Sequence, residues 1–90
     1  MPSCRATIAA EVGLHARPAA EFVKAAQATG RPITIGRVGQ AKVNAHSILA
    51  VMALGIKQGE EVEVAADGED SQGDLEALAG LLASQLDEAG

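Results

Sequence analysis

The sequence predicts an α+β fold, an open-faced β-sandwich with a four-stranded antiparallel sheet covered on one face by three helices. Apolar residues alternate with polar ones in four short segments and recur with helical spacing in three others, in the order β-α-β-β-α-β-α. The connections are too short for linkers, and 90 residues with 48% hydrophobic content suffice for one core, so residues 1–90 are expected to form a single domain. Polar residues between the apolar strand positions predict that the uncovered face of the sheet is solvated.

The first strand and the first helix meet near residue 13. Weak alternation predicts a strand over residues 5–12, with these residues on one face: Ala6, Ile8, Ala10 and Val12. Gly13 interrupts the pattern. A helix is expected to begin at Ala16 or at Pro18 and to end at Thr29-Gly30, because apolar residues recur at i, i+3, i+4 and i+7: Ala19, Phe22, Val23 and Ala26.

The middle of the chain predicts a hairpin followed by a short helix. Alternation of apolar and polar residues around Gly39 indicates two strands, with Ile33 and Ile35 in the first and Ala41 and Val43 in the second. Helical spacing then predicts a helix that Gly55 ends, with these apolar residues: Ile48, Val51, Met52 and Leu54.

The last strand and the last helix flank a turn at Asp67-Gly68. Val62 and Val64 alternate with glutamates in the strand. Residues 71–74, S-Q-G-D, resemble a capping box in which Asp74 replaces the usual Glu. The stripe that follows predicts a long helix: Leu75, Leu78, Ala79, Leu82 and Leu86.

Composition excludes several classes of function. The formal charge is -5, the seven Lys and Arg residues form no block, and Trp and Tyr are absent, so nucleic acid is not an expected partner. No secretory leader and no apolar run of about 20 residues is present, which predicts a cytoplasmic protein without membrane insertion. Cys4 stands alone and shares no ligand spacing with His15 or His46, so we expect a free thiol, no metal and no cofactor.

His15 is the candidate chemical residue, because it lies where the first strand gives way to the first helix. A helix start offers unpaired N–H groups and the positive end of the dipole, both of which attract an anion. The same dipole disfavours an imidazolium ion, which leaves a nucleophilic ring. Arg17 is expected to contact phosphate oxygens, and the N–H groups of Ala16 and Arg17 to form an anion cradle. From spacing alone, the alternative of an ordinary surface histidine stays open.

Residues 13–19, G-L-H-A-R-P-A, resemble the active-site signature of the HPr family, the histidine-containing phosphocarrier proteins of the bacterial phosphoenolpyruvate-dependent sugar phosphotransferase system. A second stretch, residues 47–55 followed by K-Q-G-E at 57–60, resembles the regulatory-serine helix of that family and the turn after it. The resemblance covers nearly the whole chain. It departs from the usual pattern at His46, where a Lys often precedes the serine, and at Ala50 and Ala53.

The resemblance implies a phosphoryl carrier, not an enzyme. It implies that His15 accepts a phosphoryl group from phosphorylated enzyme I and donates it to enzyme IIA domains in sugar uptake, with Arg17 contacting the phosphate. It also implies regulatory phosphorylation of Ser47 by a serine kinase, although Ser47 as a plain helix cap remains an equal alternative. Which ring nitrogen of His15 reacts, which sugars lie downstream, and whether a nitrogen-regulatory branch uses the protein instead stay open.

Partner docking is predicted beside His15. Ala20, Ile48, Leu49 and Met52 are the expected contact residues. Ala20 is small and lets a partner approach His15, and the other three are more apolar residues than a short helix needs to cover a sheet. Burial of those three in the core is the alternative. We expect a monomer. Two other functions are alternatives: a regulatory relative that docks on a sensor or transcription factor, and a small histidine-nucleophile hydrolase, for which the sequence offers no obvious general acid.

Overall fold

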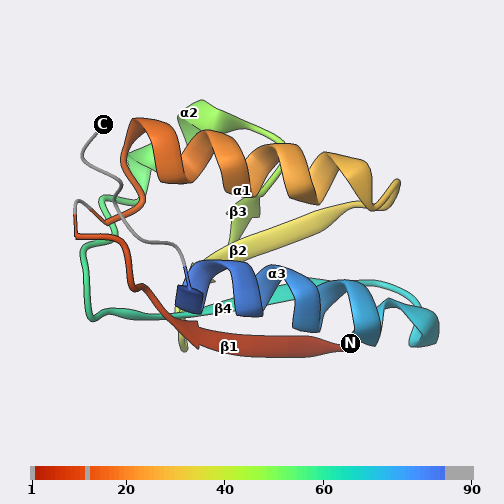
Figure 1. Cartoon of the computed structure of the whole chain (residues 1–90). Coiled ribbons are helices and arrows are strands. Elements are labelled where there is room, and N and C mark those ends of the chain that lie inside the picture. The colour runs from red at the N-terminus through yellow and green to blue at the C-terminus, as the bar shows by residue number, and fades with distance from the viewer. Residues whose placement is uncertain (1, 12, 85–90) are drawn as a thin grey trace.

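The computed structural model describes residues 2–11 and 13–84, and it has the predicted order of elements with one added 3₁₀ turn. The elements are β1 (Ser3–Thr7), α1 (Ala16–Ala28), β2 (Ile33–Arg37), β3 (Val43–Asn44), α2 (Ile48–Ala53), β4 (Glu61–Ala66), η1 (Glu69–Ser71) and α3 (Gln72–Ser84). In Figure 1, α1 and α3 lie side by side in front of the sheet and run in opposite directions, while α2 lies beside α1. The predicted open-faced α+β fold is confirmed.

Strand β4 lies inside the sheet, although it is the last strand in the sequence. The strand order is β1-β4-β2-β3, and every neighbouring pair is antiparallel. Val62 lies opposite Ala6 of β1, and Val64 lies opposite Ile35 of β2. Strands β1 and β3 therefore form the two edges.

The core lies between the sheet and the helices, and it is built from the predicted apolar faces. Phe22 of α1 is completely buried, and burying such a side chain contributes about 1.5–3 kcal/mol. The strands contribute Ile33, Ile35, Val62 and Val64, and α3 contributes Leu75, Leu78 and Leu82. Two residues assigned to these faces, Val12 and Leu86, lie outside the described residues.

The first strand differs from its prediction over residues 5–12, because β1 begins at Ser3 and ends at Thr7. The Ile8 N–H still donates to Glu60 O at 2.9 Å, but the Ala9 N–H donates to Leu82 O of α3 at 3.2 Å. The chain thus leaves the sheet for the end of a helix, a contact that alternation in a single segment does not reveal.

The hairpin is confirmed, but its second strand is shorter than predicted. Only Val43 and Asn44 form β3, opposite Ile35 and Thr34. A turn closed by the Gln40 N–H donating to Arg37 O at 3.0 Å precedes it. Ala41 lies between this turn and the strand, exposed to solvent.

The capping box predicted at residues 71–74 was wrong. Ser71 belongs to η1 and is completely buried, and its hydroxyl donates to Gly68 O at 2.7 Å. The Asp74 carboxylate pairs with Arg31 Nε at 3.0 Å instead of reaching back to Ser71. An ion pair with a distant residue has replaced the local cap.

The uncovered face of the sheet carries charged side chains, as expected for a solvated surface. Lys42 Nζ lies 2.9 Å and Arg5 Nε 3.7 Å from the carboxylate of Glu63. The hydrogen bond from Lys42 is the main cause that lowers the pKa of Glu63. Among the described helices, none combines the length and the apolar composition that crossing a membrane would require.

Candidate functional site

Helix α1 begins at Ala16, the earlier of the two predicted starts, and His15 is its N-cap residue. The His15 backbone is extended, with φ -92° and ψ -166°, and its carbonyl accepts the hydrogen bond from Ala19 N at 2.8 Å. The His15 side chain makes no capping hydrogen bond and is exposed. The ring is therefore available to a partner while the backbone is held by the helix.

The first turn of α1 is the place where the sequence predicts the anion cradle. The N–H groups of Ala16 and Arg17 precede the first intrahelical hydrogen bond, and the N–H that Pro18 lacks would precede it too. The Arg17 side chain is exposed on this turn. A dianion at His15 would thus meet the positive end of the dipole of α1 and a guanidinium within one helical turn.

The loop before His15 is held by hydrogen bonds within the loop and to Ile56. Gly13 has φ +71°, and its N–H donates to Ala10 O at 2.9 Å. The Leu14 N–H donates to Ile56 O at 3.0 Å, and the Leu14 side chain is buried. The backbone of Gly13 passes so close to Ile56 that a Cβ atom would lie 2.3 Å from Ile56 O. Residues 13 and 14 are thereby held in place, and His15, the next residue, is exposed.

His15 lines a hollow of about 220 Å³ together with residues from the C-terminal end of α2 and the segment after it. The lining residues are Leu14, His15, Met52, Gly55, Ile56 and Lys57. The sequence predicted Met52 beside the site, but it gave no site role to Gly55, Ile56 or Lys57. Helix α2 and the following segment lie far from His15 along the chain, so no local pattern signals the contact.

Ser47 is the N-cap of α2, as predicted. Its Oγ accepts a hydrogen bond from Ala50 N at 3.2 Å, and its carbonyl accepts one from Val51 N at 3.1 Å. The side chain is half-buried. This geometry accounts for Ser47 as a cap.

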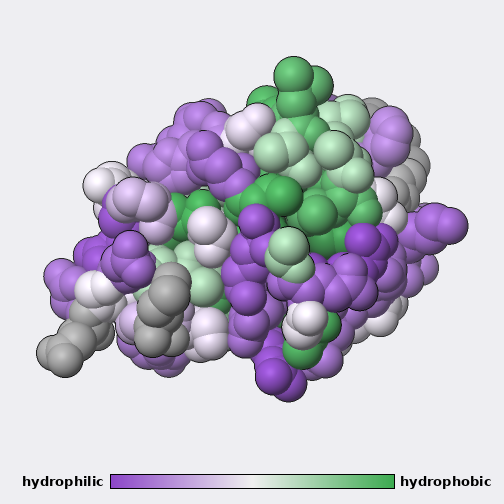
Figure 2. Space-filling view, turned by 180° about the vertical axis from the view of Figure 1, so that it is seen from behind, coloured by the Kyte–Doolittle hydropathy of each residue, from purple (hydrophilic) through white to green (hydrophobic). Residues whose placement is uncertain are grey.

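The exposed side of α2 is apolar. Ile48 is 42% exposed and Leu49 82% exposed, whereas Val51 is completely buried. Met52 and Leu54 are half-buried and pack against the core. Ala20 of α1 is also half-buried. Figure 2 shows hydrophobic side chains gathered over α2 and the surface next to it, on a face that is otherwise mainly hydrophilic. Burial in the core is thus excluded for Ile48 and Leu49, and their role in docking stays a prediction.

The segment after α2 is held by Arg37 and Glu60. Arg37 Nε and Nη2 donate to the two Glu60 carboxylate oxygens at 2.8 and 3.2 Å. The hydrogen bond from Arg37, followed by one from Lys57 N at 2.6 Å, lowers the pKa of Glu60 from 4.5 to about 2. Because the pKa is lower in the folded state, this stabilisation is present above about pH 4.5 and is lost as the pH falls towards 2.

His46 and Cys4, the other His and Cys residues in the sequence that could bind a metal with His15, each make hydrogen bonds to different residues. His46 Nε2 lies 3.0 Å from Arg31 O, and the His46 N–H donates to Asn44 Oδ1 at 2.9 Å. Cys4 Sγ accepts a hydrogen bond from Gln72 Nε2 at 3.0 Å. Within residues 2–11 and 13–84, no group of three His, Cys, Asp or Glu side chains is arranged to hold a metal ion.

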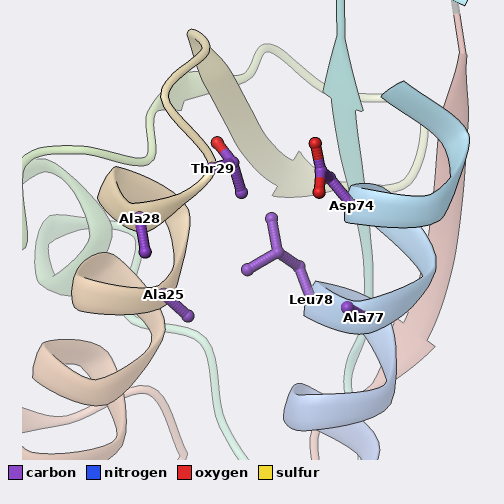
Figure 3. Close-up of a pocket in the computed structure, with 6 residues that line it drawn as sticks. All are labelled: Ala25, Ala28, Thr29, Asp74, Ala77 and Leu78. Carbon is purple, nitrogen blue, oxygen red and sulfur yellow. The ribbon is translucent and has the colours of Figure 1, made fainter. Parts of the chain in front are cut away.

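A second hollow, of about 260 Å³, lies between α1 and α3 at the other end of α1 (Figure 3). Leu78 points from α3 into the gap, and Thr29 and Asp74 close one end of it. Thr29 Oγ1 donates to Ala26 O at 2.7 Å, and Asp74 pairs with Arg31. Since α1 rises 1.5 Å per residue, this hollow is roughly 18 Å from the helix start that holds His15. It is separate from the candidate site.

The open-faced fold and the exposed histidine at a helix start define a protein of the phosphocarrier class. A family model described as "PTS HPr component phosphorylation site" matches residues 2–84. Phosphocarrier protein HPr of Streptomyces coelicolor is 53% identical over 76 residues, which are 84% of this chain and 82% of the relative. The chain belongs to the HPr family, the phosphocarriers of the phosphotransferase system.

Solved structures agree with this assignment. The crystal structure of HPr-C-His from Thermoanaerobacter tengcongensis has a TM-score of 0.82 and 39% identity, and the match covers 93% of each chain. A crystal structure of an HPr dimer from the same organism has a TM-score of 0.67 and 43% identity, over 80% of this chain and 82% of that chain.

Proposed function

We propose that His15 is the residue that carries the phosphoryl group, received from phosphorylated enzyme I and passed to enzyme IIA proteins in sugar uptake. The observation that supports this most is the exposed His15 ring at the start of α1, which is not used as a helix cap. A ring nitrogen attacks the phosphorus atom, and the bond from phosphorus to the donor group of enzyme I breaks as the bond to His15 forms. In the second transfer the same bond breaks, and the acceptor on enzyme IIA takes the group.

The surroundings of His15 suit transfer between proteins. In this proposal the N–H groups of Ala16 and Arg17 and the Arg17 guanidinium stabilise the charge that develops on the phosphate oxygens. The Ala16 and Ala20 side chains are small, so a partner can approach His15 closely. The protein acts as a single-domain, monomeric carrier in the cytoplasm and is not an enzyme with its own substrate. Sedimentation at several concentrations tests the monomer, since two similar structures are described as dimers.

Incubation with phosphoenolpyruvate and enzyme I tests this function. The protein should gain one phosphoryl group, and fragmentation should assign it to residue 15. It should then lose the group to a purified enzyme IIA protein. No phosphoryl gain, or gain at another residue, would contradict the proposal.

Arg17 is proposed to stabilise the group in transfer, so Arg17→Ala should slow phosphorylation of His15 by tens to hundreds of fold. Losing a charge-assisted contact to the transferring group costs about 2–3 kcal/mol. Arg17 is exposed, so the unfolding free energy should change by no more than about 0.5 kcal/mol. Mass measurements on samples quenched at successive times give the phosphorylation rate, and thermal unfolding gives the stability. Equal rates for the variant and the wild type would remove Arg17 from the mechanism.

Regulation at Ser47 is proposed to act on docking: a serine kinase adds a phosphate beside the apolar surface of α2, and the charge weakens contact with enzyme I. Ser47→Asp should keep or raise the melting temperature, because a negative charge at a helix start stabilises by about 0.3–1 kcal/mol. It should slow transfer at least about five-fold, the change that 1 kcal/mol of charge desolvation beside Ile48 and Leu49 gives.

Ser47→Ala is the matched control for that prediction. It removes the hydroxyl that caps α2 and should lower the unfolding free energy by about 1 kcal/mol, with transfer unchanged. Unchanged transfer in Ser47→Asp, or a marked fall in its melting temperature, would leave Ser47 as a helix cap alone.

A further inference from the structure

Arg37 lies at the end of β2, on the face of the sheet that the helices cover. Ile33 and Ile35 of the same strand are buried in the core, and alternation puts Arg37 on their side. Its side chain reaches past the core to the end of α2. Nη1 donates to Leu54 O at 2.8 Å and Nη2 to Gly55 O at 3.2 Å, in addition to the two contacts with the Glu60 carboxylate.

These contacts close the segment of residues 54–60 into a fixed shape. Arg37 binds the start of the segment through two carbonyls and its end through Glu60. The same carboxylate accepts the Lys57 N–H in the middle, and the Glu60 N–H donates to Lys57 O at 3.1 Å. The planar guanidinium is suited to this task because it presents donors in several fixed directions.

The braced segment supports the loop that leads into His15. Ile56 O accepts the Leu14 N–H, Ile8 O accepts the Gly59 N–H at 2.9 Å, and Ala9 O accepts Gln58 Nε2 at 3.2 Å. Gly55, Ile56 and Lys57 also form the wall of the hollow beside His15. A displacement of the segment would therefore move both the wall and the backbone residue directly before His15.

We propose that Arg37 is a positioning residue for phosphoryl transfer: through its contacts with Leu54 O, Gly55 O and Glu60 it holds the segment that fixes Leu14, and thereby sets the position of the His15 ring. This inference rests on the proposed role of His15. Arg37 touches no reacting atom.

Arg37 has a second, electrostatic effect on the same site. Leu54 and Gly55 follow the last residue of α2, where helix carbonyls accumulate partial negative charge. The positive charge of the guanidinium compensates the carbonyl oxygens of Leu54 and Gly55, and Gly55 lines the hollow beside His15.

Arg37→Gln in the full-length protein tests the role, with Arg31→Gln as the matched control. Arg31 is also a half-exposed arginine that pairs with acidic side chains, Asp70 and Asp74, but it lies away from the braced segment. Both variants remove one charge and its ion pairs. Phosphorylation by enzyme I and phosphoenolpyruvate, hydrogen exchange of the Leu14 N–H, and the NMR signals of the His15 ring are measured at a temperature where both variants are folded.

Arg37→Gln should slow phosphorylation about ten-fold, as expected for a small misplacement of a reacting group. Exchange at Leu14 should become faster and the His15 ring signals should shift. Arg31→Gln should keep the wild-type rate, exchange and signals, whatever its melting temperature. Arg37→Lys should recover part of the rate, because one ammonium group cannot bind both carbonyls and the carboxylate together.

Two outcomes would overturn the role of Arg37: a wild-type rate in Arg37→Gln, or an equal slowing in Arg31→Gln, which would indicate a general loss of stability. The proposed function fails in a different way, because the wild-type protein itself would then take no phosphoryl group.

Discussion

His15→Ala should abolish acceptance of the phosphoryl group and leave the fold intact. The variant removes the nucleophilic nitrogen, and no other group at the start of α1 can take its place. His15 is exposed and its side chain caps nothing, so the unfolding free energy should stay within about 0.5 kcal/mol of the wild type. Mass measurement after treatment with enzyme I and phosphoenolpyruvate, together with thermal unfolding, checks both halves of the prediction.

The chemistry of the bond gives an independent check on the wild-type protein. A phosphorus–nitrogen bond breaks in acid, because protonation of the imidazole makes it a good leaving group, and it survives base. His46→Ala is the matched histidine control, since the His46 ring bonds to Arg31 O, and it should accept the phosphoryl group normally. An acid-stable label, or a label retained in His15→Ala, would show that another residue is the acceptor.

Gly13→Ala should lower the unfolding free energy by about 2–5 kcal/mol. An alanine at φ +71° costs about 1–2 kcal/mol, and a Cβ atom 2.3 Å from Ile56 O forces a backbone shift that costs a further 1–3 kcal/mol or so. The contact is with backbone, so no side-chain rotation relieves it. Denaturant unfolding measures the loss, and phosphorylation should slow as well, because the shift lies two residues before His15.

Gly30→Ala separates the two causes. Gly30 has φ +75°, but an added Cβ would meet no atom within 4 Å. This variant should therefore show only the conformational cost and transfer phosphate at the wild-type rate. If both variants lose the same stability, the close approach of Gly13 to Ile56 contributes nothing.

Most of the fold could be predicted because its signals are local. The spacing of Ala19, Phe22 and Ala26 and the stop at Gly30 give α1, and alternation around Val62 and Val64 gives β4. The errors occur where a distant residue decides the outcome. Ala9 bonds to Leu82 and so ends β1, and Arg31 takes the carboxylate of Asp74 that the capping box required.

The candidate site likewise contains residues that local sequence predicts and residues that only the folded chain brings together. A helix start with a histidine, an arginine and a proline is a short-range pattern. Together with the family resemblance it allows His15 and Arg17 to be proposed from neighbouring residues, and Ser47 is confirmed as a helix cap. The wall formed by Gly55 and Lys57 and the brace from Arg37 depend on chain crossings that only the folded sheet produces. The charge of Arg37 could not reveal its proposed positioning role, because an arginine in a strand of alternating polar and apolar residues is common.

The place of β4 inside the sheet sets the order in which this chain can fold as it is synthesised. Strands β2 and β3 are close in sequence and can pair early, but β1 has β4 as its neighbour and waits for residues 61–66. Closing so long a loop is slow, since chain entropy is lost before the contact forms. The apolar side of β1 stays uncovered for longer still, because α3, which packs on β1, follows β4 in the sequence. The residues that lead to His15 therefore gain their support from Ile56 and Glu60 only after the chain has been synthesised past these two residues.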